Sequence, residues 1–598
     1  MKKILLTICA IMAAISSFAA KANSFPFTVS QPDGTQLTVI LHGDENINWY
    51  TTTDGMLVLQ NGNGYYAAVV NSDGSLSATN QLAHEALTRS TEERNIALSQ
   101  DRTAFAKYAE ARLGQPFELY NATNSNPLTK EMQIRNLSTL FPHTGSPKAL
   151  VILVEFSDTT FTIGNPKLSF NEYLNNDSGG IVSHGYGEQN NPKGVRGYFK
   201  DVSFGQFTPQ FDLVGPVRLA NPLAYYGKGG DNMKALFKDA CTAVDDSVDF
   251  SKYDANNDGY VDLVYIIYAG HSQSETGNSS DDIWPKSGGQ ALDTCDGKVI
   301  YRYGVNNELS GSERSRTKRI NGIGLFCHEF SHTMGLPDIY ATSGSTGYNK
   351  DDFGMEYWDL MDGGEYVRSG RYPTAYTAWE REVMGWMNVD TLSDTTHVDM
   401  AYIDKKAPNA KAYKVLNDSV RNEAMYLQNI QNKKWNTYLP GHGLLAYRVS
   451  YAKDDVNYSD RPNNGTKPRV VVIPADGKLG AMASYAHDIS PVNYFADMAG
   501  DTYPGTTGAD SILSFTTFSG TTVNKPVLNI AEDSAGIVSF DFLGVKKVVS
   551  NINNVEKPLD IKPADNRIFS ITGAYLGTDK TRLPKGIYIV NKKKIIIK

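Results

Sequence analysis

Two histidines separated by three residues, with a glutamate directly after the first, are the residues best suited to do chemistry in this chain. They stand in the segment His328-Glu329-Phe330-Ser331-His332. On a helix, side chains at positions i and i+4 lie on one face, so both imidazoles can bind a single Zn²⁺. Glu329 then lies beside a metal-bound water, where a carboxylate can take a proton and pass it to a leaving amine. The spacing therefore predicts a metal site that activates water.

The residues after the second histidine extend this pattern. Gly335 suits the left-handed conformation that ends a helix, so the chain can turn back at this point. Asp338, six residues beyond His332, can then supply a third zinc ligand. Glu356 and Glu365 are rival carboxylates for the same position, and the residues themselves leave this choice open.

A second element is the turn from Tyr357 to Gly364, which contains Met361. In metzincin-type peptidases, a methionine in such a turn forms the floor of the metal site. Met361 is predicted to be this Met-turn residue, although a methionine considered alone is more often plain core. Hydrolysis of a peptide also needs a donor for the oxyanion, and the nearby hydroxyls belong to Tyr340, Tyr357 and Tyr366.

The elements that must position these residues follow from the hydrophobic pattern. Residues 149–156 form a continuous apolar run typical of a buried strand, and strands alternate with helices up to about residue 386. The motif helix is expected to be buried, because apolar residues surround the motif at Ile323, Leu325, Phe326 and Phe330. We therefore predict an α/β (α+β), metzincin-like catalytic domain.

Segments rich in β-structure are expected on both sides of this domain. Residues 25–125 combine short strands and Asp-Gly or Asn-Gly turns with a polar helical stretch from Glu85 to Arg112. Residues 396–545 show short strands separated by Gly, Asn and Asp turns, which is typical of an all-β, sandwich-like module. The predicted division is a signal peptide (1–22), a β-rich prosegment (23–127), the catalytic domain (128–395), the β-module (396–545) and a C-terminal segment (546–598).

Composition and the N-terminus indicate an exported globular protein. Hydrophobic residues make up 41% of the 598 residues, and the net charge of −8 argues against nucleic acid as a partner. Lys2 and Lys3, the apolar stretch Ile4–Phe18 and the small residues around Ala20-Lys21-Ala22 have the layout of a secretory signal peptide. No later apolar run is long enough to cross a bilayer. We expect a secreted or cell-surface protein.

An acidic loop is a candidate site for a second ion, Ca²⁺. Its residues follow the spacing of an EF-hand loop and are Asp254, Asn256, Asp258, Tyr260 and Asp262, with the glycine that the turn needs at position 259. Position 12, however, is Tyr265 instead of a bidentate glutamate. The loop is therefore either a variant calcium site or a polar turn before the next strand.

The combined motifs resemble the immune inhibitor A family of secreted zinc metallopeptidases. Further segments support the resemblance over roughly residues 25–545, namely Leu150–Asp158, Ser203–Phe207, Ile283–Pro285, Gly385-Trp386, Leu439–Gly443 and Gly500–Gly505. The resemblance implies endopeptidase activity on protein substrates and a removable N-terminal prosegment. It also implies zinc held by His328, His332 and Asp338, with Glu329 as the general base.

The C-terminus resembles the sorting domains of the type IX secretion route. It combines a strand around Gly586 and Tyr588, a lysine cluster at 592–594, and a terminal Lys598 after an apolar stretch. The resemblance implies the secretion machinery as a partner. A small terminal β-hairpin is the alternative interpretation.

The sequence thus predicts a secreted zinc endopeptidase that is made as a zymogen. A thiolate cannot keep it latent, because no cysteine lies between Ala10 and Ala240, and Asp44 or Glu45 is a candidate cap on the metal. The alternatives are a catalytically silent surface or adhesion protein on a metallopeptidase fold and a metalloenzyme that acts on a non-peptide bond. The intact His328, Glu329 and His332 weigh against the silent protein.

Overall fold

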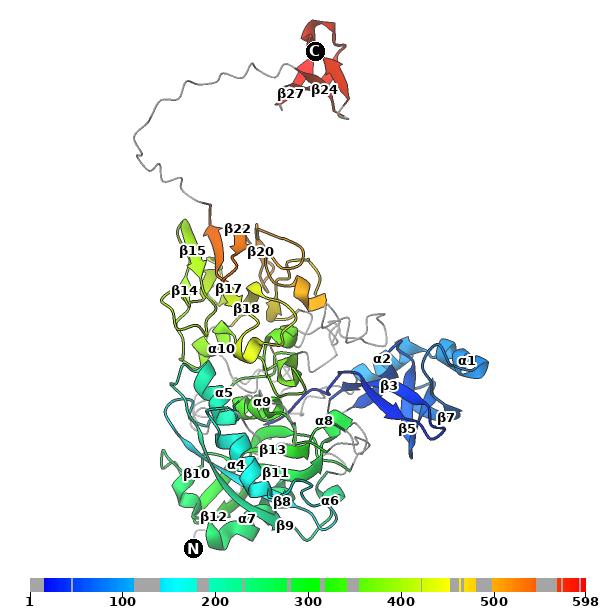
Figure 1. The fold of residues 1–598 in the computed structure, drawn as a ribbon, viewed down its shortest axis with the longest axis vertical. Coiled ribbons are helices and arrows are strands. Elements are labelled where there is room, and N and C mark those ends of the chain that lie inside the picture. The colour runs from blue at the N-terminus through cyan, green and yellow to red at the C-terminus, as the bar shows by residue number, and fades with distance from the viewer. Residues whose placement is uncertain are drawn as a thin grey trace, which may run out of the picture. The chain divides into compact units, whose positions relative to one another are not determined.

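The computed structural model divides the chain into two units, Met1–Val545 and Lys546–Lys598, which are described separately (Figure 1). The predicted boundary between the prosegment and the catalytic domain, near residue 127, lies outside the described residues. Within the described residues, no helix is both long and apolar enough to span a bilayer. The structure describes residues 16–44, 47–111, 140–179, 193–227, 232–276, 281–311, 318–340, 354–420, 422–451, 462–463, 467–479, 497–544, 567–571, 574–590 and 593–597.

A mixed seven-stranded sheet lies at the centre of the first unit. Its strand order is β1-β12-β13-β11-β8-β9, with β10 paired to β13. Strands β13, β11, β8 and β9 run parallel, whereas β12 and β1 are antiparallel to their neighbours. The strands are β1 (Ser16–Ala19), β8 (Lys148–Glu155), β9 (Gln210–Arg218), β10 (Tyr260–Val261), β11 (Val264–His271), β12 (Lys286–Cys295) and β13 (Lys298–Leu309).

Strand β8 shows that this sheet is covered on both faces. Its residues Val151 and Leu153 belong to one apolar core, whereas Ile152 and Val154 belong to another, because alternate side chains of a strand point to opposite faces. The continuous apolar run of the sequence therefore has cover on each side. The first core includes residues of α4 (Pro166–Asn175), α5 (Val195–Val202) and α9 (Ile323–Thr333), and the second includes those of α7 (Met233–Val244). Shorter helices are α6 (Leu223–Gly227), α8 (Gln273–Thr276) and α10 (Ala378–Val383).

The N-terminal segment forms an antiparallel six-stranded sheet in chain order, followed by two helices. The predicted helical stretch is interrupted, because Gln100 leaves the helix and its amide binds the carbonyls of Leu57 and Ala68, both at 2.8 Å. Asp101 then caps the next helix through the N–H of Ala104. The elements are β2 (Phe27–Ser30), β3 (Gln36–Gly43), β4 (Asn48–Thr52), β5 (Leu57–Asn61), β6 (Gly64–Val70), β7 (Leu76–Leu82), α1 (Thr91–Ser99) and α2 (Arg102–Glu110).

The region after residue 389 consists of β-sheets around a shared core. A five-stranded sheet contains β14 (Asp390–Thr391), β16 (Tyr413–Leu416), β17 (Glu423–Ile430), β18 (Gly443–Ser450) and β19 (Val470–Val472). A three-stranded sheet contains β15 (Thr396–Met400), β22 (Val527–Glu532) and β23 (Val538–Phe542), and a small pair consists of β20 (Phe515–Thr516) and β21 (Thr522–Val523).

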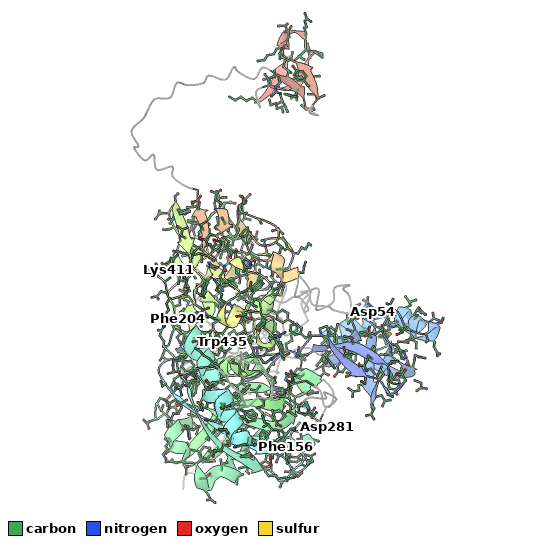
Figure 2. All side chains as sticks on the ribbon, in the orientation of Figure 1. Asp54, Phe156, Phe204, Asp281, Lys411 and Trp435 are labelled. Carbon is green, nitrogen blue, oxygen red and sulfur yellow. The ribbon has the colours of Figure 1, made fainter. Side chains whose placement is uncertain are left out.

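Strand β17 joins this β-region to the catalytic core. Met425 and Leu427 pack into the core between the sheets, whereas Ala424 and Tyr426 pack into the core that also holds α9. Nearby, Trp435, which is labelled in Figure 2, donates its Nε1–H to Asp201 at the end of α5, at 3.2 Å. Strand β17 is therefore buried on both faces.

The second unit contains a four-stranded antiparallel sheet of order β25-β24-β26-β27. Its strands are β24 (Ile568–Ser570), β25 (Tyr575–Gly577), β26 (Gly586–Val590) and β27 (Lys593–Ile597). Strand β26 carries Gly586 and Tyr588, and β27 starts within the lysine cluster. The sorting function predicted for this segment stays a prediction.

Replacement of Phe330 tests the core around α9. The Phe330 ring lies 5.1 Å from that of Phe141, 5.2 Å from Phe199 and 5.4 Å from Phe211. Phe330→Ala is expected to lower the free energy of unfolding by about 3–5 kcal/mol, because the cavity cannot close completely. Leu98→Ala, at a side chain that is 86% exposed, should change it by less than about 0.5 kcal/mol. Equal urea-unfolding midpoints for the two variants would contradict this packing.

Candidate metal centre

Helix α9 carries the motif at the centre of the core, and its sequence explains why it can pack so closely. His328, Glu329 and His332 are at most 1% exposed. A Cβ on Gly324 would lie 1.9 Å from the carbonyl oxygen of Glu365, so only glycine allows this approach between the helix and the 363–366 turn. The predicted buried motif helix is confirmed.

Three side chains converge at the C-terminal end of this helix. Nε2 of His328 lies 3.2 Å from Nε2 of His332, and Oδ1 of Asp338 lies 3.3 Å and 3.1 Å from these two nitrogens. Ligands about 2.0–2.1 Å from a tetrahedral zinc are separated from one another by about 3.3 Å. The three atoms thus have the mutual spacing that a zinc ion requires. Among the described residues, this is the group of histidine, cysteine or acidic side chains that can hold a metal.

The hydrogen bonds on the far side of each ring set the direction of the metal-facing nitrogens. Nδ1 of His328 donates to the carbonyl of Leu360 at 3.0 Å, and Nδ1 of His332 donates to that of Leu336 at 2.7 Å. A neutral imidazole that donates from Nδ1 presents a lone pair at Nε2. Two such lone pairs and a carboxylate oxygen repel one another unless a cation lies between them, so the donor set fits a divalent metal.

Gly335 allows the chain to turn so that Asp338 lies beside the two histidines. Its φ of +115° turns the chain at the end of α9, and its N–H bonds the carbonyl of His332. The turn places the Leu336 carbonyl on His332 and directs Asp338 back toward the two rings. The predicted position of Asp338 beside the histidines is thus what the structure has, whereas its role as a ligand stays a prediction.

The surroundings of the three side chains are strongly acidic. Burial acts to lower the pKa of His328, but Glu365 and Asp338 outweigh it and raise that pKa to about 10, so a bound metal would replace a proton at Nε2. Burial raises the pKa of Glu329 to about 8, and the neighbouring His328 opposes this shift. The negative surroundings favour a cation at this position.

The turn that contains Met361 holds the ring of His328 through the carbonyl of Leu360. The carbonyl of Leu360 accepts the His328 proton, and the carbonyl of Met361 accepts the N–H of Ile339 at 2.8 Å. Met361 is fully buried in the core of α9, and its N–H donates to Asp359 at 2.7 Å. The turn therefore ties the segment after the helix to the first histidine, and the Met-turn role of Met361 stays a prediction.

The rival carboxylates lie elsewhere. Glu365 faces Nδ1 of His328 at 3.5 Å, which is the side of the ring opposite to the metal-facing nitrogen. Glu356 is buried but does not belong to the group that can hold a metal. Sequence reasoning had no means to separate them from Asp338, because all three follow the motif at plausible distances.

An N-terminal strand that sequence reasoning did not place in the site runs past Glu329. Strand β1 pairs antiparallel with β12, Ser16 facing Gly289 and Ala19 facing Lys286. The N–H of Ala20 then donates to Oε1 of Glu329 at 3.0 Å. The predicted signal peptide covers this strand, and its residues 1–15 lie outside the described residues.

The chain after Ala20 is held by two aromatic side chains. Nε1 of Trp284 donates to the carbonyl of Ala20 at 2.7 Å, and the hydroxyl of Tyr366 donates to the carbonyl of Lys21. Tyr366, one of the three candidate tyrosines, thus binds the backbone of the N-terminal segment through its hydroxyl. The expected capping carboxylate Asp44 accepts a local N–H from Ile47 at 3.1 Å, and Glu45 lies outside the described residues.

The candidate calcium loop is closed by its own groups. Asp254 accepts N–H groups from Asp258 and Gly259, both at 3.0 Å, and the ammonium of Lys298 at 2.6 Å. Asp262 accepts the N–H of Ala255 at 3.1 Å. The ammonium occupies an oxygen that a calcium ion would use, so the structure shows the polar-turn arrangement and calcium binding stays a prediction.

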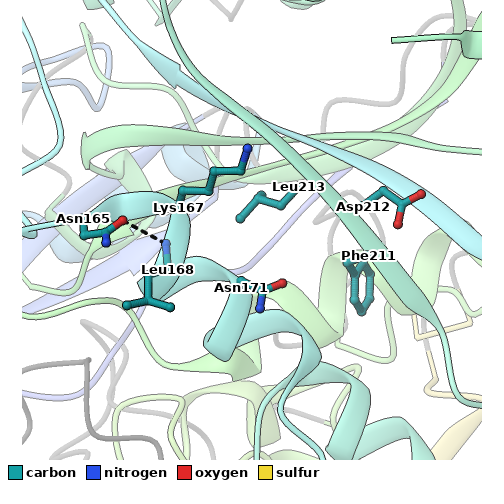
Figure 3. A pocket seen from close by; sticks show the side chains of 7 residues that line it. All are labelled: Asn165, Lys167, Leu168, Asn171, Phe211, Asp212 and Leu213. Atoms are coloured by element: carbon teal, nitrogen blue, oxygen red, sulfur yellow. Dashed lines mark hydrogen bonds between the residues drawn. The ribbon is translucent and has the colours of Figure 1, made fainter. Parts of the chain in front are cut away.

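An open hollow lies between α4 and β9 (Figure 3). Its lining consists of Asn165, Lys167, Leu168, Asn171, Phe211, Asp212 and Leu213. Asn165 caps α4 by accepting the N–H of Leu168 at 3.3 Å. No ligand of the candidate metal centre lines this hollow.

A Gly335→Ala substitution tests how the turn supports the metal centre. Alanine at this positive φ should destabilise the fold by about 1 kcal/mol or more, and the shifted Leu336 carbonyl should weaken zinc binding about tenfold or more. Gly508→Ala is the matched control, because Gly508 also has a positive φ but no atoms near its Cβ position. Competition with a chromophoric chelator measures the affinity, and equal zinc affinities for the two variants would refute the coupling.

Comparison with known proteins identifies relatives of this region. Immune inhibitor A of Bacillus thuringiensis subsp. alesti is 25% identical over 343 residues, which are 50% of this chain and 48% of that protein. Pre-pro-metalloprotease PrtV from two strains of Vibrio cholerae serotype O1 is 22% identical over 245 residues, 33% of this chain and 25% of that protein. The chain thus spans about half, or less, of the length of these curated relatives.

A family model covers strands β8 to β13 of the central sheet together with the motif helix. It is described as the immune inhibitor A peptidase M6 catalytic domain and matches residues 142–388. The segment includes His328, Glu329, His332 and Asp338. The resemblance noted in the sequence is confirmed, because residues 142–388 match the model of the immune inhibitor A (M6) peptidase catalytic domain.

Proposed function

We propose that this chain is a secreted zinc endopeptidase, made as a zymogen. The observation that carries the proposal is the spacing of 3.1–3.3 Å among the Nε2 atoms of His328 and His332 and Oδ1 of Asp338, with the carboxylate of Glu329 alongside. Bound at these atoms, zinc would polarise a peptide carbonyl. It would also lower the pKa of a bound water, so that the water can lose a proton and attack the carbonyl carbon. The match to a metallopeptidase family supports the same conclusion.

Glu329 is the residue that would move protons in this reaction. Its carboxylate is fully buried, and its Oε1 accepts a peptide N–H from the strand that occupies the cleft. A group at this place can take a proton from the attacking water and deliver it to the nitrogen of the departing amine. The raised pKa of Glu329, caused mainly by burial, suits a group that alternates between the two protonation states near neutral pH.

The substrate is proposed to bind as an added strand of the sheet. Strand β12 is bonded to β13 on one side and accepts β1 on the other. An extended peptide can use the same backbone groups, with main-chain hydrogen bonds supplying affinity. Trp284 and Tyr366 would then hold the carbonyls that follow the scissile bond, as they hold those of Ala20 and Lys21.

The same contacts would keep the precursor inactive until the predicted signal peptide is removed. Ser16–Ala19 pairs with β12 and Ala20 binds Glu329, so no substrate can take that place in the precursor. Removal of the predicted signal peptide after Ala22 would clear the strand position, so latency of the exported form would depend on the predicted prosegment (23–127) until a cut near residue 127 frees it. Export through the signal peptide and sorting through the C-terminal unit are parts of this proposal. A catalytically silent surface protein remains the competing function.

Two substitutions separate metal binding from catalysis. Glu329→Gln should retain about one zinc per chain and lower kcat/KM on an unfolded protein substrate by about 10²–10⁴-fold, because a general base is lost. His332→Ala should lose both the zinc and the activity, because a ligand is lost. Metal content and cleavage are measured on the same preparations. Full activity of Glu329→Gln would overturn the assignment of the base, and a wild type that binds zinc without cleaving would favour the silent surface protein.

Latency is tested by the position of the N-terminus. A chain that begins at Asn23 should cleave an unfolded protein faster than a chain that begins at Met1, because Ser16–Ala22 no longer occupies β12. Both chains carry the same metal ligands, so their zinc content serves as the control. Equal cleavage rates for the two chains would show that this strand does not block the site.

A further inference from the structure

The backbone of the N-terminal strand has the polarity and position of a peptide poised for cleavage. The Ala20 nitrogen is the one bonded to Glu329, which is where the departing amine of a substrate would lie. Residues on its N-terminal side pair antiparallel with β12. Ala20 therefore stands at the P1′ position, directly after the scissile bond, and Lys21 stands at P2′.

The Lys21 side chain is directed into the protein. The carbonyls of Ala20 and Lys21 are fixed by Trp284 and Tyr366, so the backbone cannot rotate freely at this residue. The Nζ atom of Lys21 is shielded from solvent and lies 5.9 Å from the centre of the Tyr340 ring. An ammonium close to an aromatic face is attracted by the ring, more strongly when water is excluded.

The segment that ends at Tyr366, whose hydroxyl binds the Lys21 carbonyl, forms an acidic wall without a basic residue. The segment from Gly354 to Tyr366 contains four carboxylates, at Glu356, Asp359, Asp362 and Glu365, and neither lysine nor arginine. All four are at most 1% exposed. The buried Oδ1 of Asp362 has no hydrogen-bond partner among the described residues, and a buried carboxylate without a compensating charge is costly, so Asp362 favours a positively charged group nearby.

Asp362 is the carboxylate of this wall whose pKa is affected by the charge of Lys21. Its Oδ2 accepts the N–H groups of Met355 and Glu356, both at 3.0 Å, whereas its buried Oδ1 accepts no hydrogen bond from the described residues. Burial raises the pKa of Asp362 to about 8, and the charge of Lys21 acts to lower it. On the other side, burial lowers the pKa of His42 to about 3, with the Lys21 charge contributing.

We propose that this cleft selects substrates with a lysine or arginine at P2′, recognised by Asp362 and the ring of Tyr340. The inference rests on the proposed peptidase function and names its substrate class. The N-terminal strand fills the subsite with a residue of the same chemistry as the selected substrate. The selectivity comes from the charge of the side chain, because the main-chain contacts on either side accept any residue.

A binding experiment tests this without requiring cleavage. Two labelled peptides with the sequence of residues 16–24 carry either lysine or the neutral, nearly isosteric norleucine at the Lys21 position. They are titrated against the zinc-loaded full chain with Glu329→Gln, which retains a hydrogen-bond acceptor but is expected not to cut. The chain's own strand lowers the apparent affinity of both peptides by one factor, so their ratio reports the subsite. The lysine peptide should bind about tenfold more tightly, as one desolvated charge contact allows.

Protein variants locate the preference. Asp362→Asn should reduce the ratio between the two peptides toward one, whereas Asp212→Asn, a carboxylate in the hollow between α4 and β9, should leave the ratio unchanged. Lys21→Met should weaken the chain's own strand and increase the affinity of both peptides together. Because the peptide pair changes the ligand alone, the test stands even if a protein variant folds poorly.

The outcomes separate this inference from the proposed function. Equal binding of the lysine and norleucine peptides overturns the P2′ preference while leaving the peptidase function intact. Failure of both peptides to bind the Lys21→Met chain overturns it as well. A clear lysine preference in a wild-type chain that cleaves no protein would retain the subsite and reject the peptidase function.

Discussion

The arrangement of the candidate metal centre depends on two hydrogen bonds, from Nδ1 of His328 and His332 to backbone carbonyls. A helix alone places two imidazoles on one face but does not decide which nitrogen faces the metal. The carbonyls of Leu336 and Leu360 accept the Nδ1–H of the two rings, which leaves Nε2 of each ring facing the metal position. One comes from the turn at Gly335 and the other from the segment that leads into Met361. The helix end, the turn and the acidic wall are thus joined at the metal-facing nitrogens.

Local sequence predicted the parts of the site that depend on local geometry. The spacing of His328 and His332 fixes their shared helix face, and Gly335 marks the reversal that returns Asp338. The choice between Asp338 and Glu365 depended on which side of the His328 ring each carboxylate approaches, and that is set by packing between segments. The buried strand of residues 149–156 was predictable from its apolar run, whereas the break at Gln100 arose from amide contacts with a distant sheet.

The pairing of the N-terminal strand with β12 could not be predicted from any local sequence pattern. Ser16–Ala19 pairs with Lys286–Gly289, and main-chain pairing of this kind requires few particular side chains. The sequence near Ala20 has the pattern of a signal peptide, which masks its ability to form a strand. An exposed edge strand tends to recruit any extended segment, and β12 would present such an edge without β1. This physical tendency underlies both the substrate mode and the latency proposed above.

The position of β17 has a consequence for how the large unit can be divided. A strand whose alternate residues serve two cores belongs to both, so neither core is complete without it. A protein shortened after the catalytic segment would present to water the apolar surface that Ala424 and Tyr426 now cover. The β-region is therefore not an independent domain that can be removed or replaced without affecting the rest of the unit. It is part of the scaffold on which the catalytic core is assembled, and the two regions should unfold together.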